Sequence, residues 1–276
     1  MKMVAAAKLR RAQDAIIAAR PYARKIRELL QHLAGRVDVS THPLFLSRPI
    51  NSVVIIVVTS DRGLCGAFNG NIVKAAVSHI HSACREYHEA GRVKLICIGK
   101  KGFDFFVKQN YKITSKHIGI FSGLNFGVAQ TIMNELVHGF QRGEYDRVEV
   151  VYNEFKSIMR QRVVIEQLLP ITSGDLKTST GTTGITGHGP YIYEPSSEEI
   201  ISALVPKHLN FQMWRVLLES NAAEQGARMT AMDSATTNAT DLIRSLQLSY
   251  NKARQASITK ELLEIVSGAE ALKKAG

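Results

Sequence analysis

The sequence has little cysteine and no long hydrophobic run. Its three cysteines, Cys65, Cys84 and Cys97, match no close-spaced zinc or disulfide framework, which suits a reducing compartment and predicts buried thiols. No stretch of eighteen apolar residues occurs, and the first residues lack the charged-then-apolar layout of a secretory signal. The sequence therefore indicates neither a membrane span nor export.

Proline is scarce, and none lies between His208 and Ala275. That segment has only two glycines, Gly226 and Gly268, and its other residues are mostly good helix formers. We therefore expect one helix of roughly 100 Å, at about 1.5 Å per residue. A compact globule of this chain length has a radius of gyration of only about 19 Å, so such a helix should extend beyond it.

Apolar residues along this helix alternate at spacings of three and four, with one slip, which predicts a coiled-coil seam. Small and large side chains are mixed, so the facing helix should approach closely. An alternative is that the long helix lies on a globular core. The seam consists of Met229, Met232, Thr236, Ala239, Ile243, Leu246, Tyr250, Ala253, Ile258, Leu262, Ile265, Ala269 and Leu272.

Residues 1 to 33 repeat this spacing and are predicted to be the partner helix, bent at Pro21. The formal charge of +11 is concentrated here, because residues 1 to 30 carry eight basic and two acidic side chains. A basic helix can track nucleic-acid phosphates or lie in a protein cavity lined with carboxylates. The seam positions are Leu9, Ala12, Ile16, Ala19, Ala23, Ile26, Leu30 and Leu33.

The middle of the chain changes to strand patterns. The continuous β-branched run 53–58 is typical of a strand buried on both faces of a parallel sheet. Further strands are expected at 93–98, 111–118, 147–155 and 161–169, and helices at 71–89, 100–109 and 125–141. Alternating strands and helices predict a doubly wound, mostly parallel α/β domain.

The segment 172–190 is rich in Thr, Ser and Gly and is predicted to be a surface loop. A short edge strand at 191–195 follows, and Ser196 with Glu199 forms a capping box for a helix that Pro206 should bend. The predicted fold class is an α/β domain inserted between two long terminal helices that form an antiparallel coiled coil. The predicted divisions are 1–45, 50–195 and 196–276.

The residues indicate no enzyme chemistry. Gly63, Gly66 and Gly70 lie between a strand and a helix, but their spacing departs from the dinucleotide-binding fingerprint. Cys65 at a strand end could be a nucleophile, yet no partner set accompanies it. His79, His81 and His88 have no carboxylate or second cysteine at metal-ligand spacing. We therefore predict no catalytic residue, no cofactor and no metal site.

Three stretches carry a family resemblance. The start Met1-Lys2-Met3-Val4-Ala5-Ala6-Ala7-Lys8-Leu9-Arg10-Arg11-Ala12, the turn Ser60-Asp61-Arg62-Gly63-Leu64-Cys65-Gly66, and the segments 224–239 and 250–268 resemble gamma subunits of F-type ATP synthases. The most specific piece is Ala256-Ser257-Ile258-Thr259-Lys260-Glu261-Leu262, followed by 264–269. The resemblance spans the whole chain.

The resemblance implies a rotor shaft that couples proton- or sodium-driven rotation of a membrane ring to conformational changes at catalytic beta subunits. In that family the terminal helices stand inside a ring of three alpha and three beta subunits, and the α/β domain is a foot against the epsilon subunit and the c-subunit ring. The resemblance implies that the chain itself catalyses no reaction and binds neither nucleic acid nor a small-molecule substrate. The location implied is peripheral on the cytoplasmic face of a bacterial inner membrane, or alternatively on the matrix side in mitochondria.

The same resemblance implies roles for particular residues. Arg228 and Gln255 stand where the family's shaft touches the beta-subunit catch loops, with Thr259 and Glu261 close by and Met1 and Lys2 facing the same region. Tyr191, Tyr193 and Glu194 stand where the foot meets the c ring. Gly63, Cys65 and Gly66 belong to the structural turn.

The sequence departs from the family in one respect, because family members usually carry further basic helix before the first motif. If that preceding helix is absent, the upper part of the C-terminal helix has no coiled-coil partner. Two alternatives remain open: a basic coiled-coil nucleic-acid-binding or scaffold protein, whose binding would weaken steeply with salt, and a free-standing α/β enzyme, which would keep its activity without the terminal helices.

Overall fold

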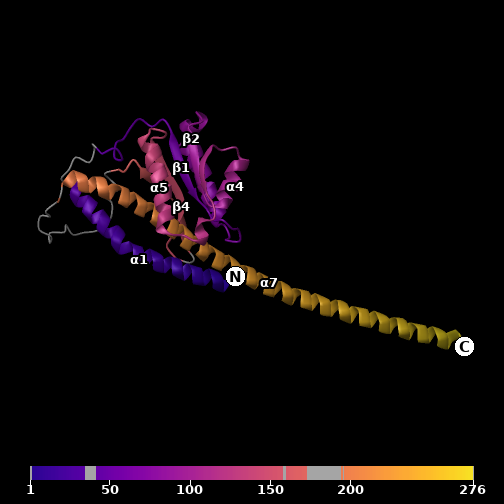
Figure 1. Ribbon diagram of the computed structural model, residues 1–276. Coiled ribbons are helices and arrows are strands. Elements are labelled where there is room, and N and C mark those ends of the chain that lie inside the picture. Colours follow the sequence, from indigo (N-terminus) through magenta and orange to yellow (C-terminus); the bar gives the residue numbers. More distant parts are fainter. Residues whose placement is uncertain (1, 35–41, 158–159, 173–193, 195, 276) are drawn as a thin grey trace. The chain divides into compact units, whose positions relative to one another are not determined.

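The computed structural model describes residues 2–34, 42–157, 160–172, 194 and 196–275 (Figure 1). The chain divides into two compact units, Met1–Thr230 and Ala231–Gly276, and each is described by itself. The three-part division that the sequence predicts stays a prediction. None of the described helices combines the length and apolar character needed to cross a bilayer.

Five strands form one sheet in the order β3-β2-β1-β4-β5 within the first unit. The first four strands pair in parallel, and the edge strand β5 is antiparallel to β4. The register sets Ile55 of β1 beside Leu95 of β2 and Glu149 of β4. The strands are β1 Val53–Val58, β2 Val93–Ile98, β3 Ile113–His117, β4 Arg147–Phe155 and β5 Gln161–Leu169.

The two faces of β1 explain its unbroken apolar sequence. Val54, Ile56 and Val58 belong to one core cluster, and Val53, Ile55 and Val57 belong to the other. All six side chains are fully buried, because helices cover both faces of the sheet. The helices of the first core are α1 Lys2–Ala34, α5 Phe126–Gln141 and the early part of α7 Ser197–Ala275; the second core is covered by α2 Phe68–Ser82 and α4 Lys100–Lys108.

Local sequence signals set several helix boundaries. The Asn125 side chain accepts a hydrogen bond from Val128 N and caps α5. Ser196 Oγ accepts a hydrogen bond from Glu199 N at 3.2 Å, so the capping residue expected before α7 is confirmed. The helix expected at 71–89 is instead two helices, because the chain leaves helical geometry at Cys84. The short elements are α3 Arg85–Glu89 and the 3-10 turn η2 Ile120–Ser122.

Helix α1 packs against the early part of α7 in antiparallel fashion. Leu9 and Ala12 cluster with Ala222, whereas Tyr22, further along α1, lies 5.3 Å from Phe211 between ring centroids. The apolar stripe predicted on α1 is confirmed, since its members are buried or half-buried. The predicted fold class is therefore confirmed, but the partner of α1 is the segment 201–223 and not the seam expected from Met229 onward.

The second unit is the remainder of α7. Every described side chain from 233 to 271 is exposed, including the seam positions in that range. The seam is therefore present as a helical stripe, and the part of the chain that the structure describes does not cover it. The bends expected at Pro21 and Pro206 stay predictions, since both prolines lie inside helices.

Candidate functional site

Side-chain hydrogen bonds hold the turn after β1, residues 60–66. Asn69 of α2 accepts a hydrogen bond from Ser60 N at 2.9 Å and donates one to Cys65 Sγ at 3.2 Å. Leu64 and Gly66 have left-handed backbone angles, with φ of 65° and 58°. Cys65 is buried while Leu64 is exposed, so the predicted structural turn is held from its inner side and presents an apolar tip.

The carboxyl ends of three parallel strands meet beside this turn. Asp61 Oδ1 accepts hydrogen bonds from Lys100 N at 3.1 Å and from Gly119 N at 2.9 Å. Gly99 has a φ of 91°, and a Cβ there would lie 2.1 Å from Thr59 O. Open α/β sheets bind ligands at this edge, but here a carboxylate of the chain itself bonds the backbone amides that face it.

Arg228 ties α7 to the turn. Its Nη1 donates to Gly63 O, and its Nη2 donates to Arg62 O at 3.4 Å and to Glu224 Oε1. The two ionised side chains are only 17% and 8% exposed, for Arg228 and Glu224. Burial raises the pKa of Glu224, and the hydrogen bond from Arg228 opposes that rise. The residue expected to touch a partner subunit thus first holds a loop of its own chain.

A depression of about 460 Å³ opens between the turn, the start of α1 and α7. The exposed Val4 and Leu64 give it an apolar rim, and Lys8, Asp61 and Glu224 give it both charge signs. Arg228 lines this depression together with residues of the motifs 1–12 and 60–66 and of the segment 224–239, whereas the segment 250–268 belongs to the second unit.

The other predicted contact residues are placed as follows. Gln255, Thr259 and Glu261 are exposed on α7 in the second unit, where Thr259 Oγ1 donates to Gln255 O at 2.9 Å. Lys2 is exposed on α1, and Glu194 is exposed in a bend. Met1, Tyr191 and Tyr193, like the loop 173–190, lie outside the described residues.

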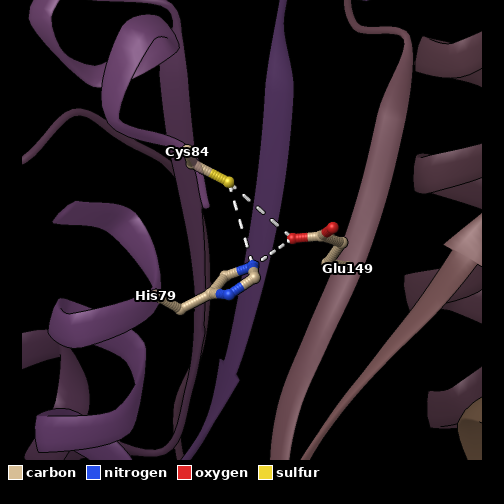
Figure 2. Close-up of side chains that lie close together, drawn as sticks. All are labelled: His79, Cys84 and Glu149. Atoms are coloured by element: carbon tan, nitrogen blue, oxygen red, sulfur yellow. Dashed lines mark hydrogen bonds and ion pairs between the residues drawn. The ribbon is translucent and has the colours of Figure 1, made fainter. Parts of the chain in front are cut away.

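Three side chains that the sequence did not connect lie together on the α2 side of the sheet (Figure 2). His79 Nε2 lies 2.6 Å from Glu149 Oε2, and Cys84 Sγ lies 3.8 Å from that nitrogen and 3.9 Å from that oxygen. The expectation of a histidine group without a carboxylate or cysteine is therefore wrong for His79. A signal existed in the sequence, since Glu149 is the one acidic residue inside the apolar run of β4 that starts at Val148 and ends at Tyr152.

The other two histidines have ordinary neighbours. The His81 ring lies 4.9 Å from the His88 ring, which stacks on Tyr111 at 5.5 Å. All three cysteines are free and buried, as expected.

Comparison with known proteins gives a consistent family. The sequence profile of a family described as ATP synthase matches residues 1–272. The chain is 57% identical to the ATP synthase gamma chain of Chlorobium phaeobacteroides over 274 residues, covering 99% of this chain and 92% of that protein. It is 55% identical to the ATP synthase gamma chain of Chlorobium chlorochromatii, with the same two coverages.

Solved structures agree in fold. A chain of the Tetrahymena thermophila mitochondrial ATP synthase central stalk and c ring matches with a TM-score of 0.61 and 25% identity, over 86% of this chain and 97% of that one. A chain of the Euglena gracilis mitochondrial ATP synthase shares the fold at a TM-score of 0.59 and 20% identity, over 97% and 95%. The alternative of a nucleic-acid-binding or scaffold protein finds no support in these matches.

Proposed function

This chain belongs to the gamma-chain family of ATP synthases, and from that premise we propose that it is the central-stalk shaft of such an enzyme. In this role it couples rotation of a membrane ring, driven by protons or sodium ions, to conformational changes at the catalytic beta subunits. Coupling through a rigid element needs unequal contacts with its partners in each of their states.

The exposed stripe on α7 is the observation that carries this proposal. Burying apolar surface gives about 25 cal/mol per Å², so a long helix that leaves such side chains in water has its stable environment elsewhere. A ring of partner subunits around the helix supplies that environment. The large side chains Ile243, Leu246, Tyr250, Ile258, Leu262 and Ile265 are between 50% and 70% exposed.

Charge on α1 supports the same kind of partner. Arg10, Arg11, Arg20 and Lys25 are all exposed on this helix. A cationic surface is complementary to a cavity that carries carboxylates, and such complementarity fixes register more than it adds affinity. The proposed partners are three alpha and three beta subunits, the epsilon subunit and the c ring.

The proposed contacts follow the family motifs. Gln255, Thr259 and Glu261 face the beta subunits directly from α7. Arg228 acts on them through the turn whose carbonyl groups it holds. Met1 and Lys2 are assigned to the same region, and Tyr191, Tyr193 and Glu194 to the c ring.

We further propose that the chain performs no bond chemistry itself and that the complex lies peripherally on the cytoplasmic face of a bacterial inner membrane. The bacterial origin of the two Chlorobium gamma chains supports that location over the mitochondrial one.

A charge placed on the exposed stripe tests the shaft role. Ile243→Asp should leave the melting temperature of the isolated chain unchanged, because that side chain is already 57% exposed. In a complex reconstituted with alpha and beta subunits, the same charge would be buried without a partner, which typically costs several kcal/mol. We therefore expect weaker assembly and loss of coupled rotation in single-molecule assays.

Ser245→Asp is the matched control, because Ser245 is exposed on the other side of the same helical turns. It should assemble and rotate like the unmodified chain. Equal behaviour of both variants in the complex would show that the stripe meets no partner and would overturn the proposal.

A further inference from the structure

Cys84, His79 and Glu149 converge on one point although they come from three different parts of the first unit. His79 belongs to the last turn of α2, Cys84 directly precedes α3, and Glu149 lies in the interior strand β4. Figure 2 shows the thiol, the imidazole and the carboxylate turned toward one another, and their ligand atoms lie within 4.8 Å of one another.

The three separations fit a metal ion. With sides of 2.6, 3.8 and 3.9 Å, the triangle of donor atoms has an interior point about 2 Å from each corner. Zinc bonds are about 2.0 to 2.2 Å to nitrogen or oxygen and about 2.3 Å to sulfur. Only the distance between His79 Nε2 and Glu149 Oε2 must increase, because two such ligands of a tetrahedral ion lie roughly 3.4 Å apart.

The backbone around the donors is fixed. Cys84 N donates to His79 O at 3.2 Å, and His88 N donates to Cys84 O at 2.9 Å. Glu149 lies opposite Ile55 in the parallel ladder and opposite Gln167 in the antiparallel one. Donors held by the protein in advance lose little freedom when a metal binds.

A second contact orients the carboxylate. Arg147 Nη1 lies 3.5 Å from Glu149 Oε1, which leaves Oε2 directed at His79 and Cys84. Outer partners of this kind typically change metal affinity by about 10- to 100-fold when removed.

The donor chemistry selects the ion. A thiolate with an imidazole suits zinc, whereas Mg²⁺ and Ca²⁺ take oxygen ligands. Thiolate and carboxylate together carry two negative charges, which Zn²⁺ neutralises. Around them the α2 face of the sheet is apolar, with Val53, Ile80 and Val151 in the same core cluster, so ionised side chains there need such compensation.

We propose that His79, Cys84 and Glu149 bind a zinc ion, which ties the junction of α2 and α3 to the interior strand β4. The fourth ligand position is taken by water. Binding releases the proton of the thiol and any proton on the imidazole. The zinc proposal does not depend on the shaft function, because none of the three ligands belongs to the turn at 60–66 or to the exposed stripe.

Cobalt substitution tests the site on the full-length chain. After treatment with a chelator, titration with Co²⁺ should give a near-ultraviolet thiolate-to-cobalt band and the strong visible bands of tetrahedral cobalt, and Zn²⁺ should remove both. Cys84→Ser and Glu149→Gln should each weaken zinc binding at least 100-fold in competition with a chromophoric chelator. Zinc should also raise the melting temperature of the unmodified chain but not that of Cys84→Ser or Glu149→Gln.

The matched controls are Cys97→Ser, which removes a second buried thiol, and His81→Gln, which removes an exposed histidine from α2, the helix of His79. Both should keep zinc affinity within about threefold. If the unmodified chain gives no thiolate band, or if Cys84→Ser binds as tightly as its parent, the proposal is wrong. The first criterion needs no variant, so misfolding of a substituted chain cannot hide the answer.

Discussion

Arg228 and Glu224 form an ion pair that is mostly removed from water, and the arginine also holds two carbonyl groups of the turn after β1. Breaking such a pair from one side leaves the other charge buried, which typically costs about 3 to 5 kcal/mol. Arg228→Ala should therefore lower the free energy of unfolding by an amount in this range, measured by denaturant titration.

The control for this prediction is Arg254→Ala, an exposed arginine on the same helix, which should change stability by less than about 0.5 kcal/mol. Combining Arg228→Ala with Glu224→Gln should restore part of the loss, since no buried charge then remains. Equal stabilities of the two arginine variants would show that the ion pair between Arg228 and Glu224 does not stabilise the fold.

His79 predicts a pH dependence of stability in the metal-free protein. Hydrogen bonds with Cys84 and Glu149 raise the pKa of His79 from 6.5 to about 9, against the opposing effect of burial. A group with a raised pKa in the folded state stabilises fully below its unfolded pKa and loses that contribution as pH rises through the folded one. With a chelator present, the free energy of unfolding should fall between about pH 6.5 and 9, by at most about 3 kcal/mol.

His79→Gln should remove that slope, because the amide does not titrate. Denaturant titrations at half-unit steps of pH measure it for both chains. A slope that persists in the variant would assign the effect to other groups.

Close packing decides which helix glycines can be replaced by alanine without loss of stability. Gly139 of α5 lies against Tyr145, and a Cβ at that position would lie 2.3 Å from Tyr145 Oη. Overpacking costs about 1 to 3 kcal/mol, whereas the better helix propensity of alanine returns at most about 1 kcal/mol. Gly139→Ala should therefore destabilise the first unit in a thermal melt.

Gly70→Ala gives the opposite expectation. Gly70 lies in α2 with nothing within 4 Å of its would-be Cβ, so only the propensity gain of up to about 1 kcal/mol applies. If both alanine variants melted at a higher temperature than the unmodified chain, Tyr145 would not pack closely against Gly139 of α5.

Periodicity predicted the elements well and their partners poorly. The strands at 53–58, 93–98, 147–155 and 161–169 have the predicted bounds, because β-branched runs between turn residues leave little choice. The stripe on α1 was also predictable, but a stripe defines a face and not the surface that covers it. Its contact with 201–223 depends on where the α/β domain fixes both helices, which no local pattern records.

The same reason explains the two site features that were missed. Glu149 lies 65 and 70 residues from Cys84 and His79, and only the strand order brings them together. Arg228 meets Gly63 across 165 residues. Glu149 stands out in the sequence as an acidic residue within an apolar strand, and Arg228 as part of a family motif. The contacts that these residues make with distant parts of the chain have no sequence signal.

For the whole molecule, we expect no nucleotide binding by the isolated chain. A phosphate at the carboxyl edge of a parallel sheet is held by backbone amides at a helix start. At Lys100, the first residue of α4, that amide already donates to Asp61. Isothermal titration of ATP should give no binding heat, with isolated alpha and beta subunits as the positive control. Stoichiometric binding to this chain would contradict the expectation.

The exposed segment 233–271 also has a consequence for the cell that makes the protein. A copy synthesised without its partners carries a long row of uncovered Ile, Leu and Tyr side chains, the kind of surface that chaperones and proteases recognise in orphan subunits. Its lifetime should then depend on supply of the other subunits. Pulse-chase labelling should show rapid loss of surplus copies, with the first proteolytic cuts after residue 233, so that production of the chain is matched to assembly by degradation.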